Sequence, residues 1–116
     1  MGIIFLDQVS VQTKLGVPDW ERLKPQTIIL DIEIGYDLSP SCQSDAIEDT
    51  VDYSSVVNRI RETLTQNSFK LLEALAEHVC KVILKEFKAE SVKIKVAKPG
   101  ILPGLKALGV IIQRMG

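Results

Sequence analysis

The sequence predicts an α+β domain in which an antiparallel four-stranded sheet carries two helices on one face. Hydrophobic residues recur at every second position in the early and late parts of the chain, and at helical spacing in the middle. The resulting order of two strands, two helices and two strands (ββααββ) places both helices on one side of the sheet. With 116 residues, 46% of them hydrophobic, we expect a single globular domain over residues 1–116.

The first two strands are expected to form a hairpin. Residues 27–38 alternate hydrophobic and polar side chains, with Ile29 as the one exception, which predicts a strand with one buried face. The preceding segment, residues 3–17, alternates less cleanly, and its change of parity near Gln8 predicts a β-bulge. The connection over residues 16–22 contains too many glycine, proline and charged residues to be a minimal turn.

The middle of the chain is predicted to hold a loop and two amphipathic helices. Residues 39–50 are small, polar and acidic, which fits a loop that crosses from the sheet to the helices. Hydrophobic residues at helical spacing then predict one helix over residues 56–64 and a second, more regular one over residues 69–87. Asn67 and Ser68 are expected to break the helical run and to cap the second helix.

Two further strands are predicted at the end of the chain. Residues 92–97 and 108–113 return to alternation with a period of two. Residues 99–104, with their prolines and glycines, separate the two strands as a turn. This second hairpin completes the predicted sheet.

The charge balance argues against several classes of partner. The chain has 14 Lys and Arg against 15 Asp and Glu, and lacks the concentrated positive charge that a nucleic acid or an anionic membrane attracts. The apolar run at residues 3–6 follows no basic residue and ends at Asp7, so it predicts neither a signal peptide nor a membrane span. Cys42 and Cys80 are too few for a disulfide framework, and we expect reduced thiols in the cytoplasm. A domain of this size buries only about two thirds of its unfolded surface, so self-association is expected.

Four segments together resemble a known family. They are Gly-Val-Pro-Asp-Trp-Glu-Arg at residues 16–22, the acidic stretch that ends in Asp-Thr-Val-Asp-Tyr at residues 44–53, Phe-Lys-Leu-Leu-Glu-Ala-Leu-Ala-Glu at residues 69–77, and Lys-Pro-Gly at residues 98–100. In order and spacing they resemble the dihydroneopterin aldolase family over essentially the whole chain. Each segment alone would be weak, because such short runs occur by chance, but four in register are specific. A local departure is Ala46, where a second acidic residue is usual.

This resemblance implies the tunnelling fold, in which several such domains close their sheets into a barrel. The family commonly assembles as a homo-octamer of two tetramer rings, with active sites between subunits. The implied reaction is the retro-aldol cleavage of 7,8-dihydroneopterin, a reduced pterin, to 6-hydroxymethyl-7,8-dihydropterin and glycolaldehyde on the route to folate. Its electron sink is the protonated imine of the pterin ring, so no metal ion, Schiff base or other cofactor is expected. His78 is the only histidine, and no cluster has metal-ligand spacing.

The resemblance implies an anchor for the pterin ring and a general acid/base. Glu73 lies near the start of the second predicted helix, where the helix dipole favours a carboxylate. By resemblance, Glu73 accepts hydrogen bonds from the amino-pyrimidinone edge of the pterin, with help from the backbone of Leu72. Lys98 precedes Pro99, which restricts it to extended conformations. By resemblance, Lys98 is the catalytic general acid/base.

Two further residues are assigned by resemblance. Glu21 resembles the family residue that binds the hydroxylated side chain of the substrate, and a carboxylate is a suitable partner for hydroxyl donors. Tyr53 resembles the family tyrosine that stacks on the pterin and passes a proton across the subunit boundary, so it is both a catalytic and a substrate-binding candidate. A tyrosine at a helix start is more often a core residue, and only its sequence context reverses that expectation.

Several other residues are expected to have structural roles only. Trp20, beside the candidate carboxylate, is compatible with packing alone. Lys93 and Lys95 are predicted to form a solvated face of their strand. His78 is expected to be a surface residue, because it faces away from the apolar stripe of its helix. Cys80 adjoins that stripe and is expected to be a buried small side chain.

Other functions stay open beside the aldolase. One is a related pterin epimerase, which inverts a side-chain carbon of dihydroneopterin or of its triphosphate. A triphosphate calls for several cations, whereas the loop offers Arg22 and Lys24 beside two carboxylates. Another is a catalytically silent ring that binds a pterin or a protein partner, which would predict the loss of Lys98 or Glu21. A purine ligand is a further alternative, because a carboxylate anchor reads the same edge in purines and pterins.

Overall fold

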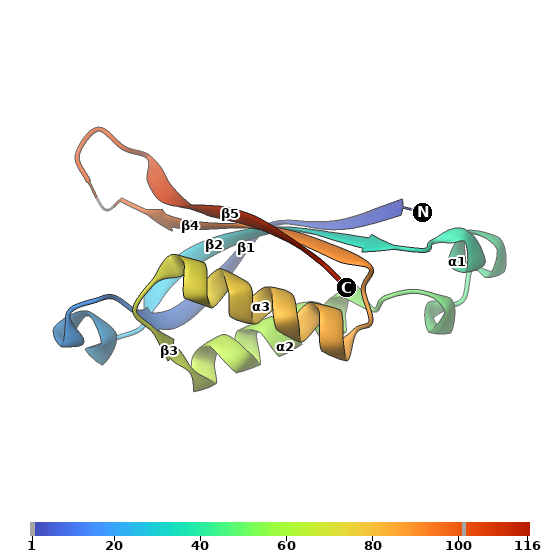
Figure 1. Ribbon diagram of the computed structural model, residues 1–116, viewed down its shortest axis with the longest axis horizontal. Coiled ribbons are helices and arrows are strands. Elements are labelled where there is room, and N and C mark those ends of the chain that lie inside the picture. Colours follow the sequence, from blue (N-terminus) through green and yellow to red (C-terminus); the bar gives the residue numbers. More distant parts are fainter. Residues whose placement is uncertain (1, 101) are drawn as a thin grey trace.

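In the computed structural model, which describes residues 2–100 and 102–116, a five-stranded sheet carries two long helices on one face (Figure 1). The elements in chain order are β1 (Gly2–Leu15), the 3-10 helix η1 (Asp19–Leu23), β2 (Gln26–Tyr36), α1 (Ser39–Ser44), the 3-10 helix η2 (Ile47–Asp49), α2 (Tyr53–Gln66), β3 (Ser68–Phe69), α3 (Leu72–Glu86), β4 (Ser91–Pro99) and β5 (Ala107–Met115). The strands lie in the order β3-β1-β2-β4-β5, and β1, β2, β4 and β5 pair antiparallel. The predicted α+β class is confirmed. Ile101, in the predicted turn, lies outside the described residues.

β3 is a fifth strand that the sequence did not predict, so the expectation of a four-stranded sheet is wrong. It pairs in parallel with the end of β1, where Lys14 lies opposite Ser68 and Leu15 opposite Phe69. A strand of two residues is too short to show alternation, which is why the periodicity of the sequence gives no sign of it. Its effect is to hold the segment before α3 against the end of β1.

The two long helices begin earlier or later than their hydrophobic patterns predict. α2 already begins at Tyr53, because the Asp52 side chain accepts hydrogen bonds from backbone N–H groups of the first turn. α3 begins at Leu72, after the short strand. Asn67 does not cap α3. Its side-chain amide instead donates to the carbonyl of Thr63 at 2.7 Å, at the end of α2.

α1 and η2 lie inside the segment that was predicted to be a loop. Pro40 lies in the first turn of α1, where its missing N–H has no partner to lose. Asp45 ends the helix with a φ of 55°, and its N–H donates to the Ser41 carbonyl at 3.0 Å. A helix of six residues without a hydrophobic stripe cannot be recognised from periodicity.

The predicted bulge in β1 is confirmed. The pairing of β1 with β2 shifts register between Leu6 and Val9. Gln8, at the bulge, has a φ of 54°, and its N–H donates to Asp31 Oδ1 at 2.8 Å. The extra residue changes which alternate positions point inward, so hydrophobic side chains on both sides of the bulge pack against the core.

The core lies between the sheet and the two long helices. The central strands contribute the fully buried residues Ile28, Leu30, Ile32 and Ile34 of β2 and Val92, Ile94 and Val96 of β4, and the helices contribute Val56, Ile60, Leu64, Leu75, Val79 and Ile83. Their spacing of three or four residues along each helix is the amphipathic pattern read from the sequence. No helix in the described part of the chain is long and apolar enough to cross a membrane.

The other face of the sheet and its outer edges are open in a single chain. Ile3, Phe5 and Ile111, on the helix-free face, are 58%, 72% and 61% exposed. Within residues 2–100 and 102–116, β5 has only β4 as a neighbour in the sheet, and β3 covers only the last two residues of β1. Long open edges present backbone N–H and C=O groups that favour pairing with another chain.

Candidate active site

A cavity of about 330 Å³ lies where the end of β1, η1, the start of α3 and the end of β4 meet. The residues Glu21, Leu72, Glu73 and Lys98 all line it, so the structure brings together all the predicted site residues except Tyr53. Larger hollows of about 590 to 670 Å³ lie on the helix-free sheet face and beside the first half of β1. The smaller cavity is the better candidate, because paired acidic and basic side chains converge on it.

Lys98 and Glu21 form a largely buried ion pair at the cavity. The Lys98 Nζ lies 3.3 Å from Glu21 Oε2, and the two side chains are 14% and 24% exposed. β4 holds Lys98 opposite Leu108 of β5. An ammonium this far out of water requires a partner, and Glu21 supplies one from a distant part of the sequence. The pair places a proton donor beside a proton acceptor, as general acid/base chemistry requires.

The loop between β1 and β2 carries Glu21 on η1. The Glu21 N–H donates to the Pro18 carbonyl at 3.1 Å, and the Gln26 side-chain amide donates to the Glu21 carbonyl at 3.0 Å. Arg22 fastens the same loop: its guanidinium donates to the carbonyls of Gly16 and Val17 and pairs with the Asp19 carboxylate. These bonds fix the loop backbone, so the position of the Glu21 side chain follows from the fold.

The start of α3 brings a carboxylate and backbone donors to the cavity. Leu71 occupies the N-cap position and its side chain makes no capping hydrogen bond, so the first N–H groups of the helix lack the usual side-chain acceptor. Glu73 is in the first turn, where the helix dipole stabilises its negative charge. Leu72 is half-buried beside it. This combination can bind the edge of a flat ring that carries both donors and acceptors.

Tyr53 lies away from this cavity within one chain. Figure 1 shows α2 and α3 running in opposite directions, so their starts lie at opposite ends of the sheet. Tyr53 is 59% exposed and lines a separate hollow of about 670 Å³ with residues of the first half of β1, including Phe5. Phe5 and Leu15 are separated along β1 by roughly 30 Å.

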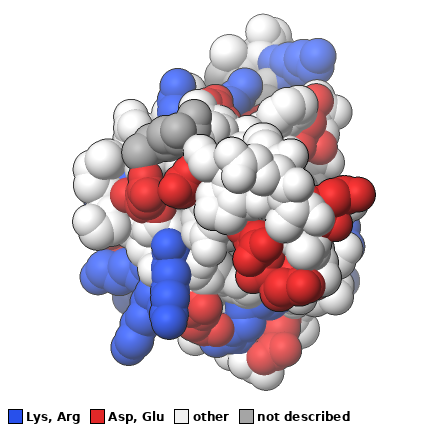
Figure 2. Space-filling model, turned by 90° about the vertical axis from the view of Figure 1, so that its right-hand side faces the viewer, with Lys and Arg blue, Asp and Glu red and all other residues white. Residues whose placement is uncertain are grey.

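Figure 2 views the end of the molecule that carries α1, where acidic and basic side chains surround uncharged surface.

The cavity also contains residues to which the sequence gave no role. Gly16, Lys70 and Leu108 line it beside the predicted residues. Lys70 follows β3 directly, so its place depends on the strand that the periodicity could not predict. Leu108 lies opposite Lys98 in the β4–β5 pair, and strand register could have predicted this position once the second hairpin was aligned.

The structure contradicts the predicted position of His78 and confirms the predicted burial of Cys80. The expectation of a surface position for His78 is wrong, because it is half-buried with Nε2 2.7 Å from Thr63 Oγ1. Burial and the charge of Arg59 lower the pKa of His78. Cys80 is buried as expected, and burial raises the pKa of its thiol to about 11. Over residues 2–100 and 102–116, no three His, Cys, Asp or Glu side chains are grouped so that they could hold a metal ion.

Comparison with known proteins gives consistent matches over nearly the whole chain. The FolB dihydroneopterin aldolase family model matches residues 4–113. The dihydroneopterin aldolase of Escherichia coli K12 is 35% identical over 114 residues, which cover 98% of this chain and 93% of that protein. The crystal structure of the E. coli enzyme in complex with neopterin has a TM-score of 0.93 and covers 98% of this chain and 99% of that one.

Two further crystal structures are similar. That of a putative dihydroneopterin aldolase from Vibrio cholerae has a TM-score of 0.95 at 36% identity and covers 100% of this chain and 98% of that one. A dihydroneopterin aldolase from Burkholderia thailendensis bound to guanine has a TM-score of 0.83 at 18% identity, covering 98% of this chain and 90% of that one. At this lower identity, the similarity concerns the fold alone.

Proposed function

Because the chain belongs to the dihydroneopterin aldolase family of folate biosynthesis, we propose that its cavity binds 7,8-dihydroneopterin and cleaves the substrate side chain between C1′ and C2′. The products are 6-hydroxymethyl-7,8-dihydropterin and glycolaldehyde. The observation that carries the proposal is the convergence on one cavity of the Lys98–Glu21 pair and of Glu73 at the start of α3. These groups supply a proton-transfer pair and a ring anchor.

The start of α3 is the proposed binding site for the pterin ring. The Glu73 carboxylate accepts two hydrogen bonds from the amino-pyrimidinone edge, and the backbone N–H at Leu72 donates to the same ring. The neopterin in the E. coli complex and the guanine in the Burkholderia complex both present such an edge. A carboxylate anchor therefore accounts for a pterin ligand and leaves purines as competitive binders.

Lys98 is the proposed general acid/base of the retro-aldol reaction. In the reactive complex its side chain is a neutral amine, so it accepts the proton of the C2′ hydroxyl while the C1′–C2′ bond breaks, and C2′ leaves as the carbonyl carbon of glycolaldehyde. The electron pair of that bond passes to C1′ and into the protonated C6–N5 imine of the ring, which gives an enamine. Lys98, now an ammonium, returns that proton to C1′, which restores the protonated imine, and loss of the N5 proton to solvent gives the hydroxymethyl product. Glu21 binds the side-chain hydroxyls during these steps.

Tyr53 is proposed to act from a neighbouring copy of the chain. Within one chain it lies at the far end of β1 from the cavity, whereas the open edges of β1 and β5 are suited to pairing between copies. Closing several sheets into a barrel gives a tetramer ring, and two stacked rings give the proposed homo-octamer. Tyr53 of the partner subunit then stacks on the pterin and passes a proton.

Epimerisation at C2′ is the second candidate activity of the same site. Retro-aldol cleavage followed by re-addition on the other face of the aldehyde gives the epimer from the same residues. A triphosphate substrate is disfavoured by one observation: the guanidinium of Arg22 is already occupied by the Gly16 and Val17 carbonyls and by Asp19. We therefore propose the unphosphorylated pterin as the substrate of this site.

The test is to incubate the purified protein with 7,8-dihydroneopterin and to follow both products. Lys98→Ala should lower the rate by about 100- to 10,000-fold, the range for removal of a general acid/base, while binding of neopterin persists. Lys93→Ala is the matched control, because Lys93 is an exposed residue of the same strand. If only the 2′-epimer formed, epimerisation and not cleavage would be the main activity of the site. Failure of the wild type to bind neopterin would overturn the assignment of the cavity.

A further inference from the structure

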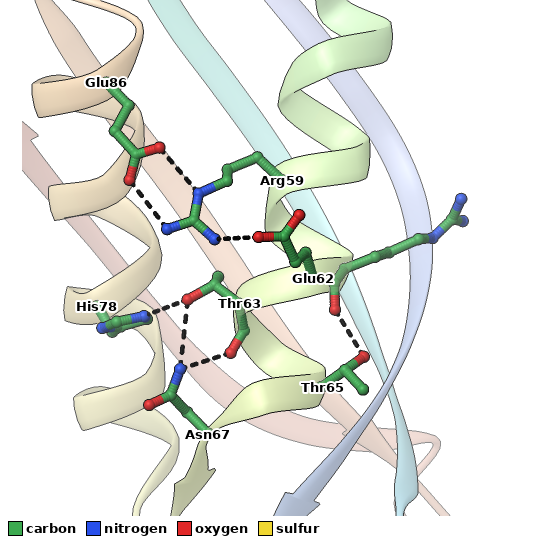
Figure 3. A network of polar contacts seen from close by, with 8 residues as sticks. Arg59, Glu62, Thr63, Thr65, Asn67, His78 and Glu86 are labelled. Carbon is green, nitrogen blue, oxygen red and sulfur yellow. Dashed lines mark hydrogen bonds and ion pairs between the residues drawn. The ribbon is translucent and has the colours of Figure 1, made fainter.

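His78 joins three elements beside the cavity. It lies on α3, and its Nε2 is 2.7 Å from Thr63 Oγ1 on α2, as Figure 3 shows. On its other side, the imidazole packs against the ring of Phe69 in β3, with ring centroids 5.4 Å apart. Asn67 completes the network by donating from its side-chain amide to the Thr63 carbonyl at 2.7 Å and to Thr63 Oγ1 at 3.4 Å. The network therefore fixes α2, β3 and α3 relative to one another.

The donors and acceptors of this network match a neutral imidazole. Thr63 is 2% exposed, so its hydroxyl depends on protein partners. If the Thr63 hydroxyl accepts from Asn67, it can donate its own hydrogen to an unprotonated Nε2 of His78. Arg59 on α2 and Lys81 on α3 both disfavour a positive charge on the imidazole, and Glu86 on α3 acts against them.

Phe69 connects the network to the cavity. Its carbonyl accepts the N–H of Gly16 at 3.0 Å, which ties β3 to the end of β1. Shortly after Phe69 the chain enters α3, so the first turn, with Leu72 and Glu73, continues directly from the strand that His78 holds. Lys98, by contrast, is held by β4. The network thus supports the ring-binding end of the cavity and not the strand that carries the acid/base.

We propose that His78 is a positioning residue that sets the place of the ring anchor Glu73 by holding Phe69 and β3, an inference that rests on the proposed pterin function. Without the imidazole, α3 loses its side-chain contacts with Phe69 in β3 and with Thr63 at the end of α2. The ring would then be bound less tightly in the ground state and in the transition state alike. Such a loss raises KM and leaves kcat nearly unchanged.

Three variants of His78 separate its two contacts. His78→Ala removes both the hydrogen bond and the ring. His78→Gln keeps an amide that can reach the Thr63 hydroxyl, and His78→Phe keeps a ring against Phe69. Arg59→Gln is the matched control, because it breaks a 2.8 Å ion pair with Glu86 that joins the same two helices without involving β3.

In His78→Ala, the KM for 7,8-dihydroneopterin and the Kd for neopterin should each rise about tenfold, because the loss of one hydrogen bond and its packing corresponds to about a factor of ten. The kcat should stay within about twofold of wild type. His78→Gln and His78→Phe should each recover part of this loss, and Arg59→Gln should bind as wild type does. A lower Tm with unchanged KM in His78→Ala would overturn the proposal, because it would leave only a structural role. A fall in kcat at unchanged KM would overturn it as well.

Hydrogen exchange of the Gly16 amide tests the same idea without a ligand. This N–H should exchange faster in His78→Ala than in wild type, relative to the amide of Ile32 in the central strand, since its acceptor is the Phe69 carbonyl. Unchanged Gly16 exchange in a protein that binds neopterin would overturn the positioning role alone. A wild type that binds no neopterin would overturn the proposed function, while faster Gly16 exchange in the variant would still establish the link from His78 to the cavity.

Discussion

Gly16 and Glu21 approach one another so closely that a β-carbon at position 16 would lie 2.4 Å from the β-carbon of Glu21. The φ of Gly16 is 145°, a conformation that residues with side chains rarely adopt. The carboxylate of Glu21 in turn lies 3.3 Å from the Lys98 ammonium. The absence of a side chain at position 16 therefore determines where the loop places the counter-ion of Lys98.

Gly16→Ala is expected to lower both stability and activity. The strained backbone and the clash should reduce the free energy of unfolding by about 1–3 kcal/mol. Displacement of Glu21 should lower kcat/KM by at least about tenfold. Urea denaturation and steady-state kinetics measure the two effects. Gly100→Ala is the control, since Gly100 has a φ of 69°, but among the described residues beyond its chain neighbours no atom lies within 4 Å of the added β-carbon. Equal losses in both variants would contradict the clash.

Glu21→Gln is expected to weaken binding of the substrate side chain more than binding of the pterin ring. A neutral amide accepts hydrogen bonds from hydroxyls less strongly than a carboxylate, so KM for 7,8-dihydroneopterin should rise by about tenfold. Calorimetric binding of 6-hydroxymethylpterin, which lacks the longer side chain, should change little. Lys24→Gln, at an exposed position of the same loop, serves as the control. Equal weakening of both pterins would refute a side-chain role for Glu21.

Glu73→Gln should weaken the binding of the pterin ring itself. Loss of charge-assisted hydrogen bonds should raise the Kd for neopterin by about 10- to 100-fold, and the Kd for guanine in parallel. Fluorescence titration with both ligands would measure this change. Glu77→Gln, one turn later on α3, removes an exposed ion pair with Arg114 and should leave ligand binding intact. Undiminished neopterin binding by Glu73→Gln would rule out the anchor.

The stability of the protein should fall as the pH drops below about 6.5, the ordinary pKa of histidine, because burial lowers the pKa of His78 in the folded state. At pH values between the lowered pKa and about 6.5, the unfolded chain binds more protons than the folded protein does. The free energy of unfolding therefore increases with pH in this range. This slope should be smaller in His78→Gln. Denaturation at about pH 7.5, 6.0 and 5.0, one value above that pKa and two below it, gives the comparison.

Asp37→Asn is the control for that pH series. The N–H of Ser39 lowers the pKa of Asp37 from 3.8, so the contribution of Asp37 to stability is present above 3.8 and is lost only as the pH falls further. Asp37→Asn should therefore keep the wild-type slope between pH 5.0 and 7.5, the range set by the histidine pKa. Identical slopes in wild type and His78→Gln would show that His78 does not titrate in this range.

Periodicity predicted the parts of the fold in which side chains repeat. The bulge at Gln8 was visible because a change of parity disturbs a long alternation. β3 was invisible because it has two residues and is defined by its parallel partner in β1. α1 was missed for a similar reason, since six residues without an apolar stripe carry no periodic signal.

The candidate site depends on contacts that local sequence cannot predict. Lys98 and Glu21 are 77 positions apart, and only the fold, or a resemblance that already includes it, brings them together. The pattern of α3 cannot predict the surroundings of His78, because the end of α2 and Phe69 cover the face of the helix on which it lies. Tyr53 and Lys98 line different cavities within one chain. The fold of a single chain therefore does not predict that the two residues act in one site.

The bulge also restricts how the length of the first strand can vary. β1 takes three residue steps from Leu6 to Val9, whereas the paired stretch of β2 takes two steps. A chain without Gln8 would take two steps on both strands, and the side chains on either side would still point toward the helices. Loss of one residue within a regularly paired part of β1 would instead turn the hydrophobic side chains on one side of the loss toward the open face. A one-residue gap in an alignment of this strand is therefore structurally neutral at the bulge, at Asp7 or Gln8, and nowhere else in the paired part of the strand.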